Sequence, residues 1–229
     1  RGPGGGLGRP FPGGGKGRGV GGRLAGRGVE DCGPEIGPGL GVLTRYLAER
    51  VERVHAVELD RSLEPYLRDI GANVSVQFGD ALQIDLGSDA TKLVANLPYN
   101  IATPVLVESL DGLPGIDLWC VMVQREVADR LFAVPSTKAY GAVSVLVQLV
   151  AERTGFHPVS RTVFRPPPNV DPALVAFKRV ALPDDYARVK RIVAGAPRAG
   201  AGLAKIGVSA SAVAARKRAN FTLVPRSAS

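Results

Sequence analysis

The sequence predicts an α/β domain built on a parallel sheet that helices cover on both faces. Short apolar runs alternate with helical stretches from Cys32 to about Asp184, and this alternation is typical of such sheets. A glycine-rich turn at residues 37–41 stands just before a predicted helix. The chain has 229 residues, 45% of them hydrophobic, which fits one domain of ~100–200 residues with appendages.

Periodicity places the elements in chain order. Apolar runs predict strands at residues 54–58, 73–78, 92–95 and 118–123. Helical spacing predicts helices at residues 42–52, 62–70, 101–110 and 124–132. Residues 142–149 fit a helix or a strand by pattern alone, and the pattern fades from about Asp184. Ligands of parallel α/β sheets bind at the carboxyl ends of the strands, so the motifs that follow these strands are the functional candidates.

The formal net charge of +8 is distributed unevenly. Residues 1–30 carry six Lys or Arg and one acid, and residues 188–229 carry nine Lys or Arg and no acid. Residues 31–187 carry 14 Lys or Arg and 20 acids, so this central part is net negative. Residues 1–30 also hold 14 of the 29 glycines without apolar periodicity, which predicts disorder. An RNA-binding arm rich in Arg and Gly is the alternative.

Three motifs predict a nucleoside-binding crevice. Gly37 and Gly39 let the backbone approach a ligand closely before the first helix; an ordinary tight turn is the alternative. Glu58 ends a strand 21 residues after Gly37, where an acid can accept hydrogen bonds from both ribose hydroxyls; a solvated glutamate is the alternative. Asp80 and Ala81 end the next strand, where a carboxylate can accept from an adenine amino group; a cap or turn is the alternative.

The lack of basic residues near the glycine turn indicates which kind of nucleoside ligand binds there. No Lys or Arg lies close to this turn in the sequence. A pyrophosphate ligand is therefore disfavoured, and we predict that S-adenosylmethionine is the cofactor.

The tetrapeptide Asn96-Leu97-Pro98-Tyr99 predicts chemistry on an exocyclic amine. The adenine amine is a poor nucleophile because its lone pair is delocalised into the ring. The Asn96 amide oxygen and the carbonyl of Leu97 or Pro98 can each accept one of its N–H bonds, which aims the lone pair at a methyl group. Tyr99 offers a face for base stacking, worth ~1–3 kcal/mol. We predict Asn96, Pro98 and Tyr99 as catalytic residues; a simple turn after a strand is the alternative.

Seven blocks, in this order, resemble those of the bacterial small-subunit ribosomal RNA adenine N6-dimethyltransferase family. They are residues 35–44 (EIGPGLGVLT), 57–61 (VELDR), 79–82 (GDAL), 95–101 (ANLPYNI), 122–131 (MVQREVADRL), 140–148 (YGAVSVLVQ) and 163–172 (VFRPPPNVDP). The resemblance implies a Rossmann-like S-adenosylmethionine-dependent methyltransferase domain followed by an incomplete C-terminal helical domain. It also implies dimethylation of two adjacent adenines near the 3′ end of small-subunit rRNA, in ribosome maturation.

The resemblance also implies residue roles. Gly37 would contact the methionine part of the cofactor, Glu58 its ribose and Asp80 its adenine. Asn96 would contact both the cofactor and the target amine. Phe164 would pack against the flipped adenine opposite Tyr99; core packing is the alternative.

Other reactive side chains are isolated. Arg125 meets RNA phosphate or belongs to a solvated helix face. His55 and His157 have no cluster of metal ligands near them in the sequence, so we expect no metal. Cys32 and Cys120 are expected to be reduced and intracellular.

The chain departs from the family at both ends. Residues 7–12 (LGRPFP) stand where the family has a Phe-Gly-Gln-Asn-Phe-Leu-like block, and Pro34 is poorly placed for a central strand. After about residue 196, a sequence rich in Arg, Gly and Ala stands where the family has its basic helical domain. We therefore divide the chain into a disordered or aberrant segment at 1–33, the methyltransferase domain at 34–180, and a remnant of the helical domain at 181–229. Translation of the coding DNA out of frame at both ends would explain why the family's sequence is missing there. Translating that DNA in the other two frames tests this hypothesis.

These observations predict an rRNA adenine dimethyltransferase that acts as a cytoplasmic monomer on small-subunit rRNA or its precursor particle, without a membrane. Two other functions stay open. One is a non-catalytic RNA-binding or ribosome-assembly factor on the same fold. The other is an adenine N6-methyltransferase of large-subunit rRNA or DNA.

Overall fold

The computed structural model describes residues 32–86, 89–164 and 167–194. Residues 1–31 and 195–229 lie outside the described residues. They include most of the segment expected to be disordered or aberrant at 1–33 and all of the stretch after about residue 196, whereas Cys32 and Gly33 begin the first strand. The strands are β1 (Cys32–Ile36), β2 (Arg53–Glu58), β3 (Val74–Phe78), β4 (Lys92–Asn96), β5 (Leu118–Gln124), β6 (Ala151–Pro158) and β7 (Pro172–Arg179). The helices are α2 (Val42–Ala48), α3 (Glu64–Leu67), α4 (Ala102–Gly112), α5 (Arg125–Leu131), α6 (Ala142–Val150) and α7 (Tyr186–Ala194), with 3₁₀ turns η1 (Arg61–Leu63) and η2 (Arg161–Val163).

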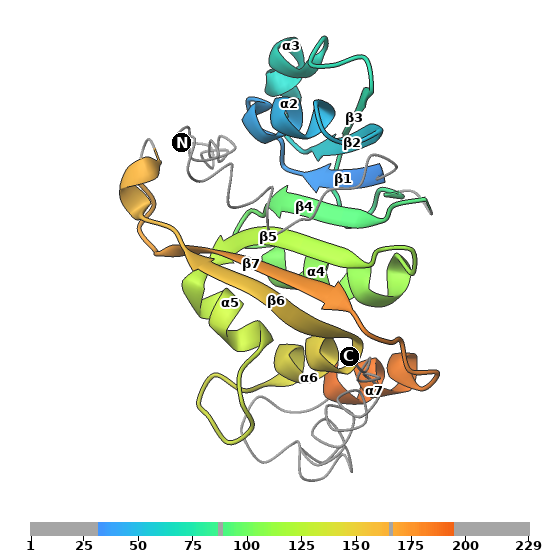
Figure 1. The fold of residues 1–229 in the computed structure, drawn as a ribbon, viewed down its shortest axis with the longest axis vertical. Helices are drawn as coiled ribbons and strands as arrows, with labels where there is room; N and C mark the ends of the chain where they lie inside the picture. Colours follow the sequence, from blue (N-terminus) through green and yellow to red (C-terminus); the bar gives the residue numbers. More distant parts are fainter. Residues whose placement is uncertain (1–31, 87–88, 165–166, 195–229) are drawn as a thin grey trace, which may run out of the picture.

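The strands lie side by side in one twisted layer (Figure 1). Parallel ladders join β1 to β2, β2 to β3, and β4 to β5. Strand β7 is antiparallel to both of its neighbours, β5 and β6. Apart from this strand the sheet is parallel, and its order β3-β2-β1-β4-β5-β7-β6 is Rossmann-like. The predicted α/β class is confirmed.

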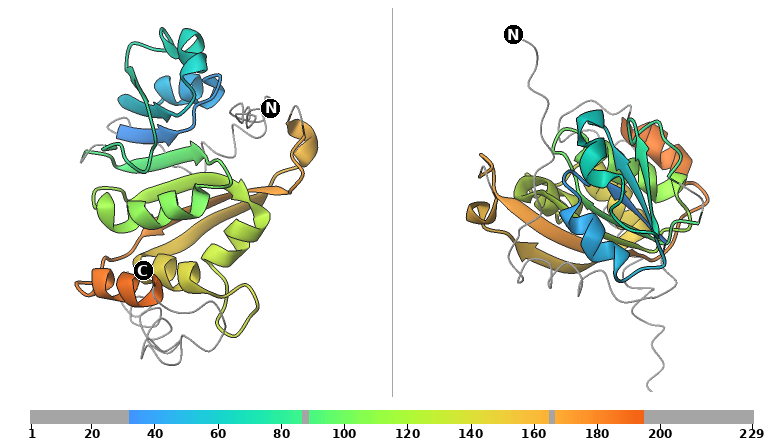
Figure 2. Two further views of the ribbon diagram at one scale, coloured as in Figure 1. Left: turned by 180° about the vertical axis from the view of Figure 1, so that it is seen from behind. Right: turned by 90° about the horizontal axis from the view of Figure 1, so that it is seen from above.

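Two apolar layers bury the faces of the sheet. The larger one joins α4, α6 and α7 to one face, through residues such as Leu106, Leu146 and Val189. The smaller one joins α2 to the other face, through Leu43 and Leu47. Figure 2 shows these helices on opposite sides of the sheet.

Strand β1 forms despite Pro34. The Gly37 amide donates to the Val57 carbonyl on β2, and successive amides of a strand point to alternate neighbours. Odd-numbered amides of β1 therefore face β2, and the missing N–H of Pro34 falls on the side of β4. Within the described residues, β1 forms a hydrogen-bonded ladder with β2 but not with β4, although β1 and β4 lie side by side (Figures 1 and 2). Proline is thus accommodated at an edge of the hydrogen-bonded sheet.

The helix boundaries differ from the predicted ones where residues far away in the sequence bind the helix end. The helix expected at 42–52 ends at Ala48, because the Asn73 amide donates to the carbonyls of Ala48 and Val51 from across the fold. The helix expected at 62–70 is a 3₁₀ turn followed by one short helix. The ambiguous stretch at 142–149 is helix α6.

Helix α7 lies beyond the point where the sequence pattern fades. Tyr186, Val189 and Val193 are buried in the larger core layer. The Lys190 ammonium bridges Glu108 and Asp111 of α4 at 2.8 and 2.9 Å. The segment expected to begin a separate helical domain at residue 181 therefore packs, as far as residue 194, on the α/β core.

Candidate active site

The predicted motifs meet at the carboxyl ends of β1, β2, β3 and β4, at one edge of the sheet (Figure 1). Parallel strands bring these ends together because they all run in the same direction. The glycine turn follows β1, Glu58 ends β2, Asp80 follows β3, and Asn96 ends β4.

The glycine turn has a backbone that other residues adopt only with strain. Gly37, Gly39 and Gly41 have φ angles of +73°, +58° and +76°. A Cβ on Gly37 would lie 3.6 Å from Pro98 Cδ and 3.7 Å from the Asn96 carbonyl oxygen. The turn predicted for the cofactor therefore lies directly against the tetrapeptide predicted for the chemistry.

We expect Gly41→Ala to lower the free energy of unfolding by about 1–3 kcal/mol. Its φ is positive, and a Cβ there would lie 2.0 Å from Ile70 Cδ1 and 3.2 Å from Leu67 Cδ2. Urea denaturation measures the loss. The matched control is Gly112→Ala, because a Cβ on Gly112 meets nothing within 4 Å. Equal stability of the two variants would contradict this interpretation of the turn.

Glu58 ties the glycine turn to the end of β2. Its carboxylate is 6% exposed. Oε2 accepts from the Gly39 amide and Oε1 from the Asp60 amide, both at 3.0 Å. Glu58 is therefore a buried, oriented carboxylate, and the alternative of an ordinary solvated glutamate is wrong.

Asp80 makes the contacts of a turn residue. Its Oδ1 accepts from the Leu82 amide at 3.0 Å, and its Oδ2 accepts from the Gln83 side chain at 3.3 Å. The Gly79 amide donates to the Glu58 carbonyl at 2.8 Å, which joins the end of β3 to the end of β2. Asp80 therefore lies near Glu58, where β2 and β3 end side by side. The carboxylate of Asp80 itself stabilises the turn that follows β3.

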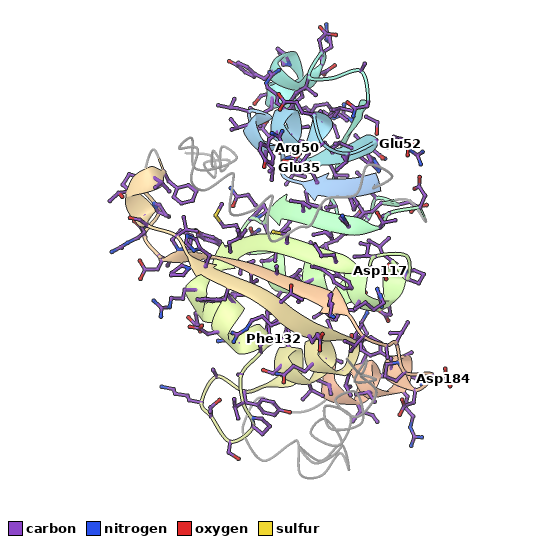
Figure 3. The ribbon with its side chains drawn as sticks, viewed as in Figure 1. Glu35, Arg50, Glu52, Asp117, Phe132 and Asp184 are labelled. Atoms are coloured by element: carbon purple, nitrogen blue, oxygen red, sulfur yellow. The ribbon has the colours of Figure 1, made fainter. Side chains whose placement is uncertain are left out.

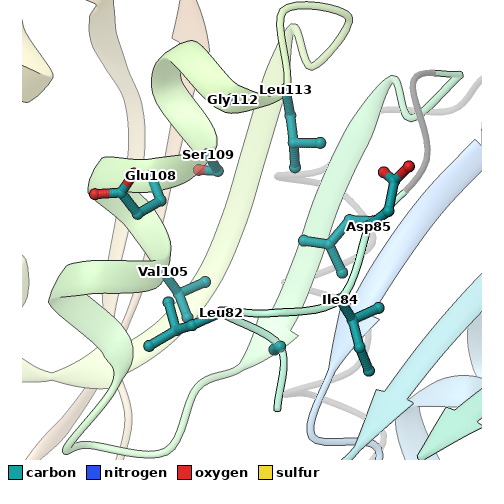
Figure 4. Close-up of a pocket in the computed structure, with 10 residues that line it drawn as sticks. Leu82, Ile84, Asp85, Val105, Glu108, Ser109, Gly112 and Leu113 are labelled. Atoms are coloured by element: carbon teal, nitrogen blue, oxygen red, sulfur yellow. The ribbon is translucent and has the colours of Figure 1, made fainter. Parts of the chain in front are cut away.

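A pocket of about 190 Å³ opens beside this turn (Figure 4). Ala81, Leu82 and Ile84 line one side, and Val105 and Ser109 of α4 line the other. Ala81, which we predicted at the cofactor, therefore borders a cavity between the segment that follows β3 and helix α4.

The tetrapeptide is held by backbone hydrogen bonds on both sides. The buried Leu97 donates its amide to the Met122 carbonyl at 3.1 Å. The Pro98 carbonyl accepts from the amides of Ile101 and Ala102, at 3.1 and 3.0 Å, and so begins α4. Because the Pro98 carbonyl is engaged, the geometry favours the Leu97 carbonyl as the second acceptor for an amine. Asn96 and Tyr99 are partly exposed at this edge.

Phe164 does not stand opposite Tyr99 as an exposed ring in this conformation. It is 3% exposed and packs with Met122 and Leu174 in the smaller core layer. The core-packing alternative describes this arrangement. A stack on a flipped adenine requires the ring to leave that layer.

Glu35 is a site residue to which the sequence motifs assigned no role. Its side chain is 1% exposed on β1, near the glycine turn and α2 (Figure 3). Burial raises the pKa of Glu35 to about 8; the Thr44 hydroxyl opposes this shift, and the Glu58 carboxylate adds to it. An acid placed between a buried strand and a glycine turn is the sequence signal that could have identified it.

The other reactive side chains singled out in the sequence make separate, local contacts in the described residues. His55 bonds to Gln77 at 3.2 Å across the sheet, and Arg125 lies 3.8 Å from Asp129 on its own helix. Among the described residues, no group of three metal-ligating side chains gathers. In the same part of the chain, none of the helices has the length and apolar character needed to cross a bilayer.

Comparisons with known proteins identify the family. The family described as "Ribosomal RNA adenine dimethylase" matches residues 34–194. The ribosomal RNA small subunit methyltransferase A of Rubrobacter xylanophilus is 47% identical over 171 residues, covering 72% of this chain and 65% of the relative. That of Lactococcus lactis is 43% identical over 161 residues, covering 65% of this chain and 55% of the relative. The chain thus spans less than two thirds of the length of these relatives.

Solved structures show the same fold. The 23S rRNA methyltransferase ErmE superposes with a TM-score of 0.63 at 27% identity, covering 88% of this chain and 82% of that one. A dimethyladenosine transferase of Plasmodium falciparum superposes with a TM-score of 0.64 at 23% identity, covering 87% and 75%. The fold is therefore that of Rossmann-like methyltransferases. Because the family match extends over well more than half of its residues, the chain belongs to the ribosomal RNA adenine dimethylase family.

Proposed function

We propose that this chain transfers methyl groups from S-adenosylmethionine to the N6 amine of adenines in small-subunit rRNA. The observation that carries the proposal is the contact between the glycine turn and the tetrapeptide. Gly37 lies against both Pro98 and the Asn96 carbonyl, so a cofactor held by the turn and an amine held by Asn96 would adjoin.

The residues at the strand ends fit the cofactor. Positive φ angles and the missing side chain at Gly37 leave room for a ligand close to the backbone. Glu58 supplies a buried carboxylate at the position suited to ribose hydroxyls, and Asp80 with Ala81 would border the adenine. When bound, S-adenosylmethionine supplies a methyl group activated by its sulfonium.

The chain's own contribution at the amine is positioning. The Asn96 amide oxygen and the Leu97 carbonyl would each accept one N–H of the target amine, which directs its lone pair toward the cofactor. Tyr99 would stack on the base, and Pro98 fixes the turn that presents all three groups. Holding two reactants in line removes much of the entropic barrier to transfer. Phe164 would close over the base only after leaving the core layer.

The names of the relatives support small-subunit rRNA as the substrate, since the R. xylanophilus and L. lactis proteins are both named for it. ErmE, a 23S rRNA methyltransferase, shows that the same fold serves large-subunit rRNA. We also propose that the chain acts in the cytoplasm and that it is a monomer. Sedimentation of the purified protein tests the oligomeric state.

Methylation mapping on both rRNAs tests the substrate. Purified chain and S-adenosylmethionine are incubated with unmethylated small-subunit and large-subunit rRNA, and methylated adenines are located by mass spectrometry. We expect dimethylation of two adjacent adenines near the 3′ end of the small-subunit RNA. Methylation of large-subunit RNA alone would contradict the proposal that small-subunit rRNA is the substrate. Cofactor and RNA binding without any transfer would favour the non-catalytic assembly factor.

A further inference from the structure

Glu35 is a buried acid with an unsatisfied oxygen beside the glycine turn. Its side chain is 1% exposed. Within the described residues, neither Oε2 of Glu35 nor the nearby Oγ1 of Thr44 makes a well-formed hydrogen bond, so the Thr44 hydroxyl offsets only part of the effect of burial on the pKa of Glu35. A buried polar atom without a good partner destabilises the folded chain, and a bound ligand that satisfies the atom would offset this cost.

Among the described residues, the groups that shift the pKa of Glu35 include no cation. Strands β1 and β2 pair Glu35 with Ala56, so its side chain shares a face with Glu58, two residues further along β2. Helix α2 contributes the Thr44 hydroxyl, while its Arg45 is exposed and turned to the Tyr66 carbonyl. Strand β4 has Lys92 at its opposite, amino end, close to Gly33.

The charged partner among these is therefore another carboxylate. Glu58 adds to the shift that burial imposes, and together they raise the pKa of Glu35 to about 8. At pH 7 and without a ligand, the neutral acid form of Glu35 thus outnumbers the carboxylate form by about ten to one.

We propose that Glu35 is a positioning residue that loses its proton when a positively charged cofactor binds against the glycine turn. This inference rests on the proposed function, because the cation is that of S-adenosylmethionine. The O–H bond of the Glu35 carboxyl breaks, its electron pair stays on the carboxylate, and the proton passes to solvent. The positive ligand supplies an attraction that the described part of the chain does not provide around this buried group.

The coupling discriminates between cofactor and product. S-adenosylmethionine carries a sulfonium, whereas S-adenosylhomocysteine, which remains after transfer, does not. A neutral thioether gives less reason for Glu35 to ionise. Glu35 therefore favours the charged cofactor over the spent one. It does so most strongly above about pH 8, where Glu35 is already ionised before the ligand binds and none of the attraction is spent on removing its proton.

Calorimetry of the purified chain tests the proposal. Titration with S-adenosylmethionine at pH 7 in two buffers of different ionisation enthalpy counts the protons released. We expect about one proton per ligand, and a dissociation constant that falls about tenfold per pH unit between pH 6 and 8 and is level above pH 8. S-adenosylhomocysteine should release clearly fewer protons.

The variant Glu35→Gln identifies the group. It should bind S-adenosylmethionine without this proton release, while protons from the ligand's own amine persist. Glu126→Gln, an exposed glutamate on α5, is the matched control and should release protons as the parent does. Binding without proton release in the parent, equal release in Glu35→Gln, or equal release with both ligands would overturn the inference while leaving the cofactor intact. Failure to bind either ligand would instead overturn the proposed function and the inference with it.

Discussion

Asn96→Ala is expected to lower the rate of methyl transfer by about a hundredfold to a thousandfold, while cofactor binding is partly retained. The amide oxygen is one of two acceptors that would hold the target amine, and losing one oriented polar group from an active site typically has an effect of this size. The Leu97 carbonyl and Tyr99 remain, so RNA would still bind with its base less well oriented. Single-turnover transfer of a labelled methyl group measures the rate.

The adjacent Asn100 provides the control for this variant. It is exposed and follows Tyr99 in the same turn, so Asn100→Ala removes the same chemical group without touching the predicted acceptor pair. Calorimetry with S-adenosylmethionine should give a partly reduced affinity for Asn96→Ala and the parental affinity for Asn100→Ala. Full activity of Asn96→Ala would remove Asn96 from the mechanism.

Glu35→Gln should raise the free energy of unfolding at pH 7 by about 3 kcal/mol. The pKa of Glu35 is raised from 4.5 to about 8 in the folded chain, so the folded state binds more protons than the unfolded state between these values. Stability is then highest below pH 4.5 and falls by about 1.4 kcal/mol per pH unit up to pH 8. A glutamine cannot ionise and escapes this loss.

Urea denaturation between pH 5 and 9 measures the effect as the difference between variant and parent. The difference should grow from about 1 kcal/mol at pH 5 to about 4 kcal/mol at pH 8, where it levels off. Glu52→Gln, at an exposed glutamate before β2, should give a small difference that does not follow this curve. Parallel pH profiles for the parent and Glu35→Gln would show that Glu35 is ionised in the fold.

Local patterns predicted the elements whose stabilising contacts are also local. Apolar runs located β2, β4 and β5 within a residue or two, because each is buried on both faces of a parallel sheet. The glycine turn and the tetrapeptide were predicted to share a site because both follow parallel strands, and the contact of Gly37 with Pro98 confirms their proximity.

Elements defined by distant contacts escaped prediction. Strand β6 is largely polar and, among the strands of the described residues, is the last one in the order and pairs with β7 alone. Helix α7 has a short apolar stripe that gains its stability against α4 and α6. The early end of α2 depends on Asn73, a residue 25 positions from Ala48.

The same limit applies to the site. The pattern around Asp80 and Phe164 is compatible with two roles for each residue. Their side chains take the structural one here, in a turn and in a core layer. The burial of Glu35 follows from the packing of α2 on β1, which the motif alone does not reveal.

A crystal structure with a non-transferring analogue, in which an amine replaces the sulfonium methyl, tests the central claim most directly. The account predicts the ribose hydroxyls at Glu58, the methionine part along residues 37–41, and the replacing amine directed toward Asn96. An analogue bound away from this edge of the sheet, or with its amine directed away from Asn96, would contradict the account.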